Sequence, residues 1–566
     1  DVYKRQTRRR ARRVVRVTRR RVVRSRQIMR VVAALSLALA LSAASCDAIS
    51  VNARWRVDAL RARAIRRGIG GGHDASARTS IGAHERWFAE QRLDHFDNAL
   101  NASWTQRYFV NDAYASAERG APVFVCVGGE GPALDVDVAV DGGEHCAIAT
   151  ALAKKHRGLF FALEHRFYGK SQPTGDLSVE SLRFLSSAQA LEDLVTFTRF
   201  AAAAYGLEIE PRNDGRKYSK VIAFGGSYPG MLAAWSRVKF PHVFHAAVAS
   251  SAPVRAQIDM RGYYEVVGDA LREKDVGGSD ACYTAVENAF TVRLNEALKT
   301  SSGRRALEKQ FNVCGDEALD GVGARDDFAD VLRAMFPAQN NDPSCLADDD
   351  SCFNIAKACT IMTSHGEDKL AALAAHVAAV FRGECVSLDS EAYMRELKSE
   401  IPNPKGEGER QWTWQTCTEF AFFQTCEKSS KCPFKLDPPT MPLEAYHKIC
   451  ADVFGVSAEQ TRLAVERSNA RYGSITPGGT RIMFPSGSID PWIANSFVSD
   501  TFAPRFEPAL IVKGASHHAW THPPKDTDTD ALVEARAIIV GQVEKWLNEG
   551  PMVGRRNDAR LRVAEA

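Results

Sequence analysis

Short apolar runs separated by helix-like stretches make up the first part of an ordered region, residues 86–259. Four of these runs are continuously apolar rather than alternating with polar residues, at residues 123–127, 159–163, 221–224 and 246–250. Continuous apolar strands are typical of a parallel sheet that is buried on both faces, and the helical stretches between them supply the covering layers. The pattern therefore predicts an α/β domain built on a parallel sheet.

The pattern changes over residues 260–455, which are mostly helical in character and contain ten of the thirteen cysteines. Strand-like runs return at residues 481–484 and 509–512, and a closing helix is expected from about residue 530 to residue 548. The simplest interpretation is that one α/β domain is interrupted by a helical, cysteine-rich domain and resumes over residues 456–550.

The net charge of +4 conceals a strongly basic N-terminus. Residues 1–28 hold thirteen Lys and Arg against one acid, which is +12, so the rest of the chain carries 4 − 12 = −8. A basic arm by itself would fit a nucleic-acid-binding tail. However, Met29 opens a segment whose apolar run, residues 31–44, ends in small residues, as in a signal peptide. We expect residues 29–45 to be a signal peptide and residues 1–28 to be upstream sequence.

The alternative is a signal anchor, but a run of 14 residues is shorter than the roughly 20 that a membrane-spanning helix needs. No later segment is long and apolar enough to span a membrane. Residues 46–85 are rich in Arg, Gly and Ala and are expected to be a flexible lead-in or propeptide. Residues 551–566 are expected to be a tail.

The cysteines support entry into the secretory pathway. Without Cys46, at the cleavage zone, twelve remain, an even number that suits an oxidising compartment. Cys126 lies in an apolar strand run, so we expect it to be a buried free thiol. Asn101-Ala102-Ser103 is a glycosylation sequon, which predicts a glycan on Asn101. The location expected is lysosomal, vacuolar or extracellular.

A serine stands in a glycine-rich turn between a predicted strand and a predicted helix. Ser227 lies in Gly225-Gly226-Ser227-Tyr228-Pro229-Gly230. A serine on such a turn exposes its hydroxyl near the positive end of the helix dipole. The strict Gly-x-Ser-x-Gly pattern fails at Pro229, but proline is tolerated in a first helical turn. By itself the motif fits an ordinary glycine-rich turn equally well.

Candidate partners follow two later strands. Asp490 comes after the run at residues 481–484, and the pair His517-His518 comes after the run at residues 509–512. Ser, then Asp, then His is the chain order of α/β-hydrolases, in which the histidine takes the serine proton and the carboxylate orients the histidine. The chemistry of the residues does not separate His517 from His518. We therefore predict an α/β-hydrolase fold with a helical, disulfide-rich cap inserted between nucleophile and acid.

Acyl transfer also needs hydrogen-bond donors for the oxyanion. One is expected to be the backbone N–H of Tyr228, which directly follows the candidate nucleophile. The other is expected from the early loop Gly128-Gly129-Glu130-Gly131, at Gly129, because glycines let the backbone approach a substrate. The alternative for this loop is a plain turn.

Further motifs make the sequence similar to the proline-specific serine exopeptidases, the family of lysosomal Pro-X carboxypeptidase, dipeptidyl peptidase II and thymus-specific serine protease. The resemblance runs from about Trp87 to Leu547 and is nearest to the thymus-specific branch. It is carried by Leu93-Asp94-His95-Phe96, Gln106-Arg107-Tyr108-Phe109, Gly128-Gly129-Glu130-Gly131-Pro132, Glu164-His165-Arg166-Phe167-Tyr168-Gly169, Gly225-Gly226-Ser227-Tyr228, Ala249-Ser250-Ser251-Ala252-Pro253-Val254, Gln415-Thr416-Cys417-Thr418-Glu419-Phe420 and Asp490-Pro491-Trp492.

The resemblance implies roles for particular residues. It makes Ser227 the nucleophile, Asp490 the acid and His517 the base of a peptidase that cleaves after proline through an acyl-enzyme. It also implies that Glu130 holds the free amine of a substrate, with a loop-stabilising carboxylate as the alternative. Met231 and Trp492 would help to form an apolar pocket for proline, with core packing as the alternative.

A physical reason links proline to such a pocket, because a proline amide has no N–H with which to pair in an extended complex. The expected partners are short proline-containing peptides, without nucleic acid, a stable membrane span, a metal or a cofactor. Two rival functions stay open, an esterase or lipase on the same fold and a catalytically silent binding protein. The sequence also leaves open whether dipeptides or single carboxy-terminal residues are released, and whether the chain forms a homodimer.

Overall fold

The computed structural model describes residues 82–550 apart from residues 117, 212–215, 317, 322, 344, 346–351, 389, 441 and 499–507. The predicted upstream segment, signal peptide and tail, and all but the end of the predicted lead-in, lie outside the described residues. Within the part of the chain that is described, every helix is too short or too polar to cross a lipid bilayer.

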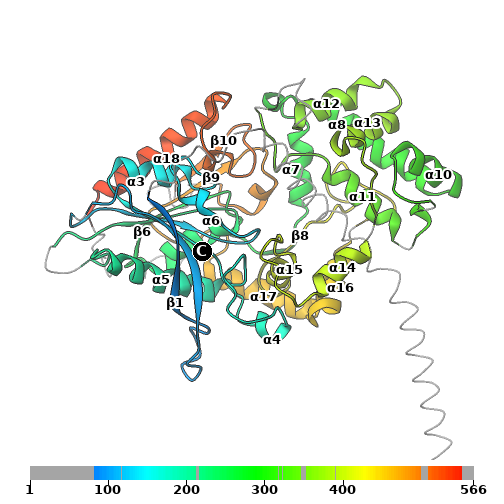
Figure 1. Cartoon of the computed structure of the whole chain (residues 1–566). Helices are drawn as coiled ribbons and strands as arrows, with labels where there is room; N and C mark the ends of the chain where they lie inside the picture. Colours follow the sequence, from blue (N-terminus) through cyan, green and yellow to red (C-terminus); the bar gives the residue numbers. More distant parts are fainter. Residues whose placement is uncertain are drawn as a thin grey trace, which may run out of the picture.

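An eight-stranded sheet forms the middle layer of one lobe of the molecule (Figure 1). Its strand order is β1-β2-β4-β3-β5-β6-β9-β10; the six strands from β4 to β10 pair in parallel, whereas β1 and β2 are antiparallel at one edge. The strands are β1 (Ala83–Arg92), β2 (Ser103–Asn111), β3 (Val123–Val127), β4 (Leu159–Leu163), β5 (Val221–Gly226), β6 (Phe244–Ser250), β9 (Ile482–Gly487) and β10 (Ala509–Val512).

The two antiparallel strands were not predicted. β1 begins at Ala83, inside the stretch expected to be a lead-in, and most of its residues are exposed. As an edge strand it pairs on one side only, so it lacks the continuous apolar run that marks β3 and β4. The remaining strands confirm the predicted parallel sheet and its position in the sequence.

Helices cover both faces of the sheet, and two separate apolar cores result. On β3, Val123 and Val125 face the core that includes α5 (Ser187–Ala204) and α6 (Tyr228–Lys239). Phe124 faces the second core, which includes α3 (Ala147–Lys155) and α18 (Asp530–Asn548). The alternation explains why the strand is apolar at every position.

Helices α7 to α16 form a second lobe, in green and yellow in Figure 1. Its small parallel sheet pairs β7 (Gln257–Asp259) with β8 (Ala421–Phe423). We propose that α7 to α16 form one domain, the cap. The helices of the cap are α7 (Gly262–Ala270), α8 (Asp280–Asn288), the π-helix η4 (Ala289–Leu294), α9 (Asn295–Leu298), α10 (Ser301–Gln310), α11 (Ala324–Ala334), α12 (Ile355–Ser364), α13 (Lys369–Phe381), α14 (Ser390–Lys398), α15 (Glu409–Gln415), the π-helix η6 (Thr416–Phe420) and α16 (Leu443–Phe454). Outside the cap lie the short α4 (Val179–Leu182) and α17 (Ala458–Tyr472).

Six disulfides pair all twelve cysteines of the described residues. Five lie in the cap, as Cys282–Cys359, Cys314–Cys385, Cys345–Cys352, Cys417–Cys450 and Cys426–Cys432. The sixth joins Cys126 to Cys146, so the prediction that Cys126 is a free thiol was wrong. The side chain is buried as expected, but the start of α3 brings a second cysteine against it. This number of disulfides fits a protein that folds in the secretory pathway.

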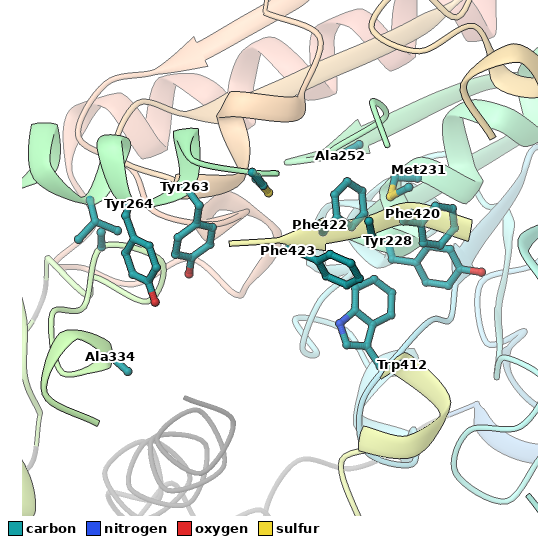
Figure 2. Packing of buried hydrophobic residues seen from close by; sticks show 14 of the residues in the cluster. Tyr228, Met231, Ala252, Tyr263, Tyr264, Ala334, Trp412, Phe420, Phe422 and Phe423 are labelled. Carbon is teal, nitrogen blue, oxygen red and sulfur yellow. The ribbon is translucent and has the colours of Figure 1, made fainter. Parts of the chain in front are cut away.

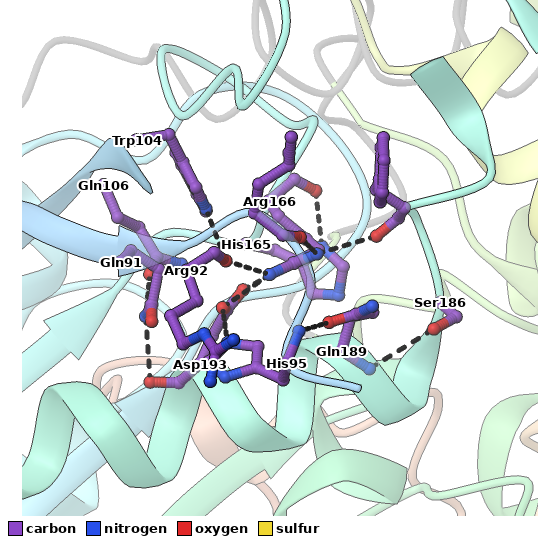
Figure 3. A network of polar contacts seen from close by, with 12 residues as sticks. Gln91, Arg92, His95, Trp104, Gln106, His165, Arg166, Ser186, Gln189 and Asp193 are labelled. Atoms are coloured by element: carbon purple, nitrogen blue, oxygen red, sulfur yellow. Dashed lines mark hydrogen bonds and ion pairs between the residues drawn. The ribbon is translucent and has the colours of Figure 1, made fainter. Parts of the chain in front are cut away.

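A buried ion pair holds the N-terminal strands against α5 (Figure 3). The Arg166 guanidinium donates to both carboxylate oxygens of Asp193, at 2.6 and 2.7 Å, and the remaining donors bond to backbone carbonyls. His95 reaches the same carboxylate at 2.8 Å. Burial raises the pKa of Asp193, but Arg166 outweighs it and the net pKa lies below its usual value. Every charge of the pair is therefore compensated inside the core.

This pair yields a test of the fold. Asp193→Ala leaves Arg166 buried without its counter-charge, so we expect the free energy of unfolding to fall by about 3–5 kcal/mol. Urea denaturation with the disulfides intact measures the loss. Glu459→Ala, which breaks the exposed Arg462–Glu459 pair, is the control and is expected to change little. Equal, small effects of the two substitutions would contradict the role given to Asp193.

Candidate active site

The backbone turns sharply at Ser227, between β5 and α6. Ser227 has φ +63° and ψ −132°, which a non-glycine residue adopts only under strain. Its N–H donates to the Ser250 carbonyl at 2.9 Å, so the neighbouring strand β6 holds the turn in place. This geometry lifts the serine hydroxyl above the end of the sheet.

The glycines of the motif are required by close approaches. A Cβ on Gly225 would stand 2.2 Å from the Pro229 carbonyl oxygen, and a Cβ on Gly230 would stand 2.8 Å from the Ser250 carbonyl oxygen. Pro229 lies in the first turn of α6, where a backbone N–H has no partner within the helix. The departure from Gly-x-Ser-x-Gly is therefore accommodated without disturbing the turn.

Asp490 and His517 meet at the ends of β9 and β10. Asp490 is fully buried, and its Oδ2 lies 2.8 Å from Nδ1 of His517. Its other oxygen accepts the Trp492 N–H at 3.0 Å, so both carboxylate oxygens are fixed. A carboxylate in this position fixes the tautomer of the histidine and leaves Nε2 to accept a proton.

The adjacent histidine has a different environment. The His518 ring lies 3.3 Å from Thr521 Oγ1, and a Cβ on Gly226 would stand 3.0 Å from the ring. The histidine loop therefore packs directly against the Ser227 turn. Burial, together with His517 and two further histidines nearby, lowers the pKa of His518 well below its usual value. Asp490 thus pairs with His517, and His518 stays neutral beside it.

Glu130 lies in the loop after β3, where the sequence predicted an oxyanion-binding turn. Its carboxyl lies close enough to the Ser227 hydroxyl and to the N–H of Tyr228 for both groups to lower its pKa. Burial outweighs these neighbours and raises the pKa of Glu130 to about 7. One oxygen, Oε2, is buried and has no hydrogen-bond partner among the described residues. The predicted donor Gly129 packs against Pro229, where a Cβ would stand 2.3 Å from the proline ring.

The hydrogen bonds of the described residues include none between the Ser227 hydroxyl and His517. Catalytic hydrogen bonds often form only in the substrate complex. Glu130 also lies close enough to His517 for the histidine charge to act on its pKa. Ser227, Glu130 and His517 therefore share one site, with Asp490 behind the histidine.

Aromatic side chains of the cap lie beside Met231, one of the two residues predicted to line a proline pocket (Figure 2). Met231 is fully buried in the same core cluster as Phe420 and Phe422. The Trp492 ring lies 5.4 Å from Phe422 and 6.2 Å from His517. The sequence did not single out the two phenylalanines as neighbours of Met231 and Trp492, because only the folding of the cap brings them here.

The chain also carries features outside this site. Asn101, the predicted glycosylation residue, is exposed between β1 and β2. Among the described residues no group of three or more His, Cys, Asp or Glu side chains is arranged to hold a metal ion.

Comparison with known proteins gives a consistent result. A family model described as Serine carboxypeptidase S28 matches residues 91–539. The thymus-specific serine protease of Homo sapiens is 34% identical over 488 residues, covering 85% of this chain and 89% of that protein. The corresponding Mus musculus protein is 33% identical over 491 residues, covering 85% and 90%. The lysosomal Pro-X carboxypeptidase of Bos taurus is 23% identical over 472 residues, covering 82% and 88%.

These matches agree with the turn at Ser227 and with the resemblance seen in the motifs. The chain belongs to the serine carboxypeptidase S28 family and is a serine-type peptidase.

Proposed function

We propose that this peptidase removes residues from the ends of short peptides by cleaving after proline. Ser227 is the nucleophile, His517 the general base and Asp490 the acid. The observation that carries the proposal is the 2.8 Å hydrogen bond between Asp490 and His517, in a loop packed against the strained turn of Ser227.

The reaction follows from this arrangement. His517 Nε2 takes the proton as Ser227 Oγ attacks the carbonyl carbon, and the imidazolium is stabilised by Asp490. The oxyanion accepts hydrogen bonds from the backbone N–H groups of Tyr228 and Gly129. Because the Glu130 carboxyl lies close to the Tyr228 N–H, the substrate carbonyl has to take the place of that carboxyl beside this donor. His517 then protonates the leaving amine, and water releases the acyl group by the reverse sequence.

The preference for proline is supported by the surroundings of Met231 and Trp492. A proline side chain is a compact apolar ring without an N–H, so affinity has to come from buried apolar contact rather than from main-chain pairing. Phe420 and Phe422 contribute aromatic surface next to Met231 and Trp492.

Glu130 supports the release of dipeptides from the amino end. A buried carboxylate oxygen without a partner is a costly arrangement unless a ligand completes it. The ammonium group of a free N-terminus has the complementary charge and three donors. Among the groups that act most on the Glu130 pKa there is no lysine or arginine to take that place. The proposed location is lysosomal, vacuolar or extracellular.

The first test is chemical labelling and reporter hydrolysis. The protein should react with a fluorophosphonate at Ser227 and should hydrolyse a dipeptide reporter that ends in proline faster than a p-nitrophenyl ester. Ser227→Ala should abolish both, since it removes the attacking oxygen. Intact protein that stays unlabelled would favour a silent binding protein, and preference for the ester would favour an esterase.

The second test concerns Glu130 and the substrate amine. Glu130→Gln keeps the shape but removes the charge, so we expect KM for a free-amine Ala-Pro reporter to rise about tenfold or more. The N-acetylated reporter is the control and should not lose binding. A rise in KM of the same size for both reporters would argue against an amine site. Mass analysis of products from a peptide with proline near each end identifies the terminus that is attacked.

The third test uses pH. The folded pKa of Glu130, about 7, lies above its usual 4.5, so the folded state prefers the protonated form. The stabilisation that the folded state gains from protonated Glu130 is fully present below pH 4.5 and is lost as pH rises through 7. Relative to Glu130→Gln, the wild type should therefore lose up to about 3 kcal/mol between those pH values. Thermal unfolding of both proteins from pH 4 to pH 8 measures the difference, and a difference that does not change with pH would contradict the raised pKa.

A further inference from the structure

A glutamine of the cap contacts the proposed catalytic base and the tryptophan beside the triad. Gln339 lies in the segment that leaves α11, and its carbonyl accepts the His517 N–H at 3.0 Å. Its side-chain Oε1 accepts from Tyr263 Oη at 2.7 Å and from Trp492 Nε1 at 3.2 Å. Nothing in the sequence singled this residue out, because its neighbours come from three distant parts of the chain.

These bonds fix the orientation of the amide. An indole N–H only donates, so the group that faces Trp492 has to be the oxygen of Gln339. The Nε2 group consequently faces away from Trp492 and Tyr263. It has no hydrogen-bond partner among the described residues, and Gln339 is only partly buried. The site therefore contains two oriented N–H donors beside Trp492, with the acceptor of the same amide already occupied.

We infer that Gln339 is a substrate-binding residue whose Nε2 donates to the carbonyl oxygen of the residue that precedes proline in the substrate. The inference rests on the proposed function, since it takes Trp492 as part of the proline pocket. A residue–proline amide offers an acceptor and no donor. A group that presents only donors is therefore the complement of that segment of the substrate.

The segment around Gln339 is built to hold a fixed position. The carbonyl of Asn341 accepts from Ser516 Oγ at 2.8 Å, which ties the segment to the histidine loop a second time. The Asn354 side chain donates to the carbonyls of Asp342 and Cys345 at 3.2 and 3.0 Å. A donor held in this way loses little conformational entropy when it binds a substrate.

The substitution Gln339→Glu removes the Nε2 donor while keeping the hydrogen bonds that hold the side chain in place. It keeps an oxygen for Tyr263 and Trp492 but replaces the N–H donors by a carboxylate oxygen. We expect kcat/KM for the Ala-Pro reporter at pH 7 to fall about tenfold, the loss of one hydrogen bond. The ratio of variant to wild type should recover as pH falls toward 4, because the protonated acid can donate again. Asn340→Ala, at the exposed neighbouring residue, is the matched control and should stay within twofold of wild type.

A thioamide reporter, Ala-Pro with sulfur in place of the carbonyl oxygen before proline, completes the test. Wild type should lose activity on this weaker acceptor, whereas Gln339→Glu should treat the two reporters alike. Labelling of Gln339→Glu by the fluorophosphonate should proceed at the wild-type rate, since that probe has no such carbonyl.

Three results would overturn the inference. The first is wild-type hydrolysis of Ala-Pro by Gln339→Glu at pH 7. The second is a labelling rate that falls as much as peptide hydrolysis, which would mean that Gln339 acts only by positioning His517. The third is wild-type protein that labels normally but cleaves no proline reporter. That result removes the proposed specificity and this inference with it, whereas the first two leave the specificity intact.

Discussion

The strained backbone at Ser227 is the constraint on which the rest of the site depends. A side chain held at φ +63° between a strand and a helix needs close neighbours that prevent relaxation. Strand β6 supplies one through the Ser250 carbonyl, and the glycines at 225 and 230 allow the chain segments to approach closely enough. The close packing of the sheet against α6 therefore determines the backbone conformation of the turn at Ser227.

A chain of polar groups fixes the next residue and joins the two lobes. Gln415 of the cap donates to the Tyr228 hydroxyl at 3.0 Å, and that hydroxyl lies 3.0 Å from Nε2 of His165. Because His165 Nδ1 faces a carbonyl at 2.7 Å, its Nε2 is the acceptor and Tyr228 donates to it. Burial lowers the pKa of His165 to about 4, which keeps the ring neutral and this direction of hydrogen bonding constant. The cap is thereby connected to Tyr228, the residue whose backbone N–H is proposed to bind the oxyanion.

The sequence predicted the features that depend on runs of neighbouring residues. The bounds of β3 and β4, the Ser-Asp-His order and the helical insertion could all be predicted from runs of residues. The choice between His517 and His518 could not, because both follow the same strand and differ in backbone direction, with His518 at φ +40°. The pairing of Cys126 and the place of Gln339 depend on contacts between distant segments, for which a single sequence carries no local signal.

The order of the proposed triad along the chain has a consequence for biosynthesis. His517 follows Ser227 by 517 − 227 = 290 residues, and the whole cap is translated between them. A ribosome making this protein exposes the serine turn long before the base and the acid exist. The nascent chain accordingly carries no working hydrolase while the cap is being made, and proteolytic capacity arises only when β9 and β10 join the sheet. Chain order by itself thus delays activity until the strands that carry the acid and the base have been made.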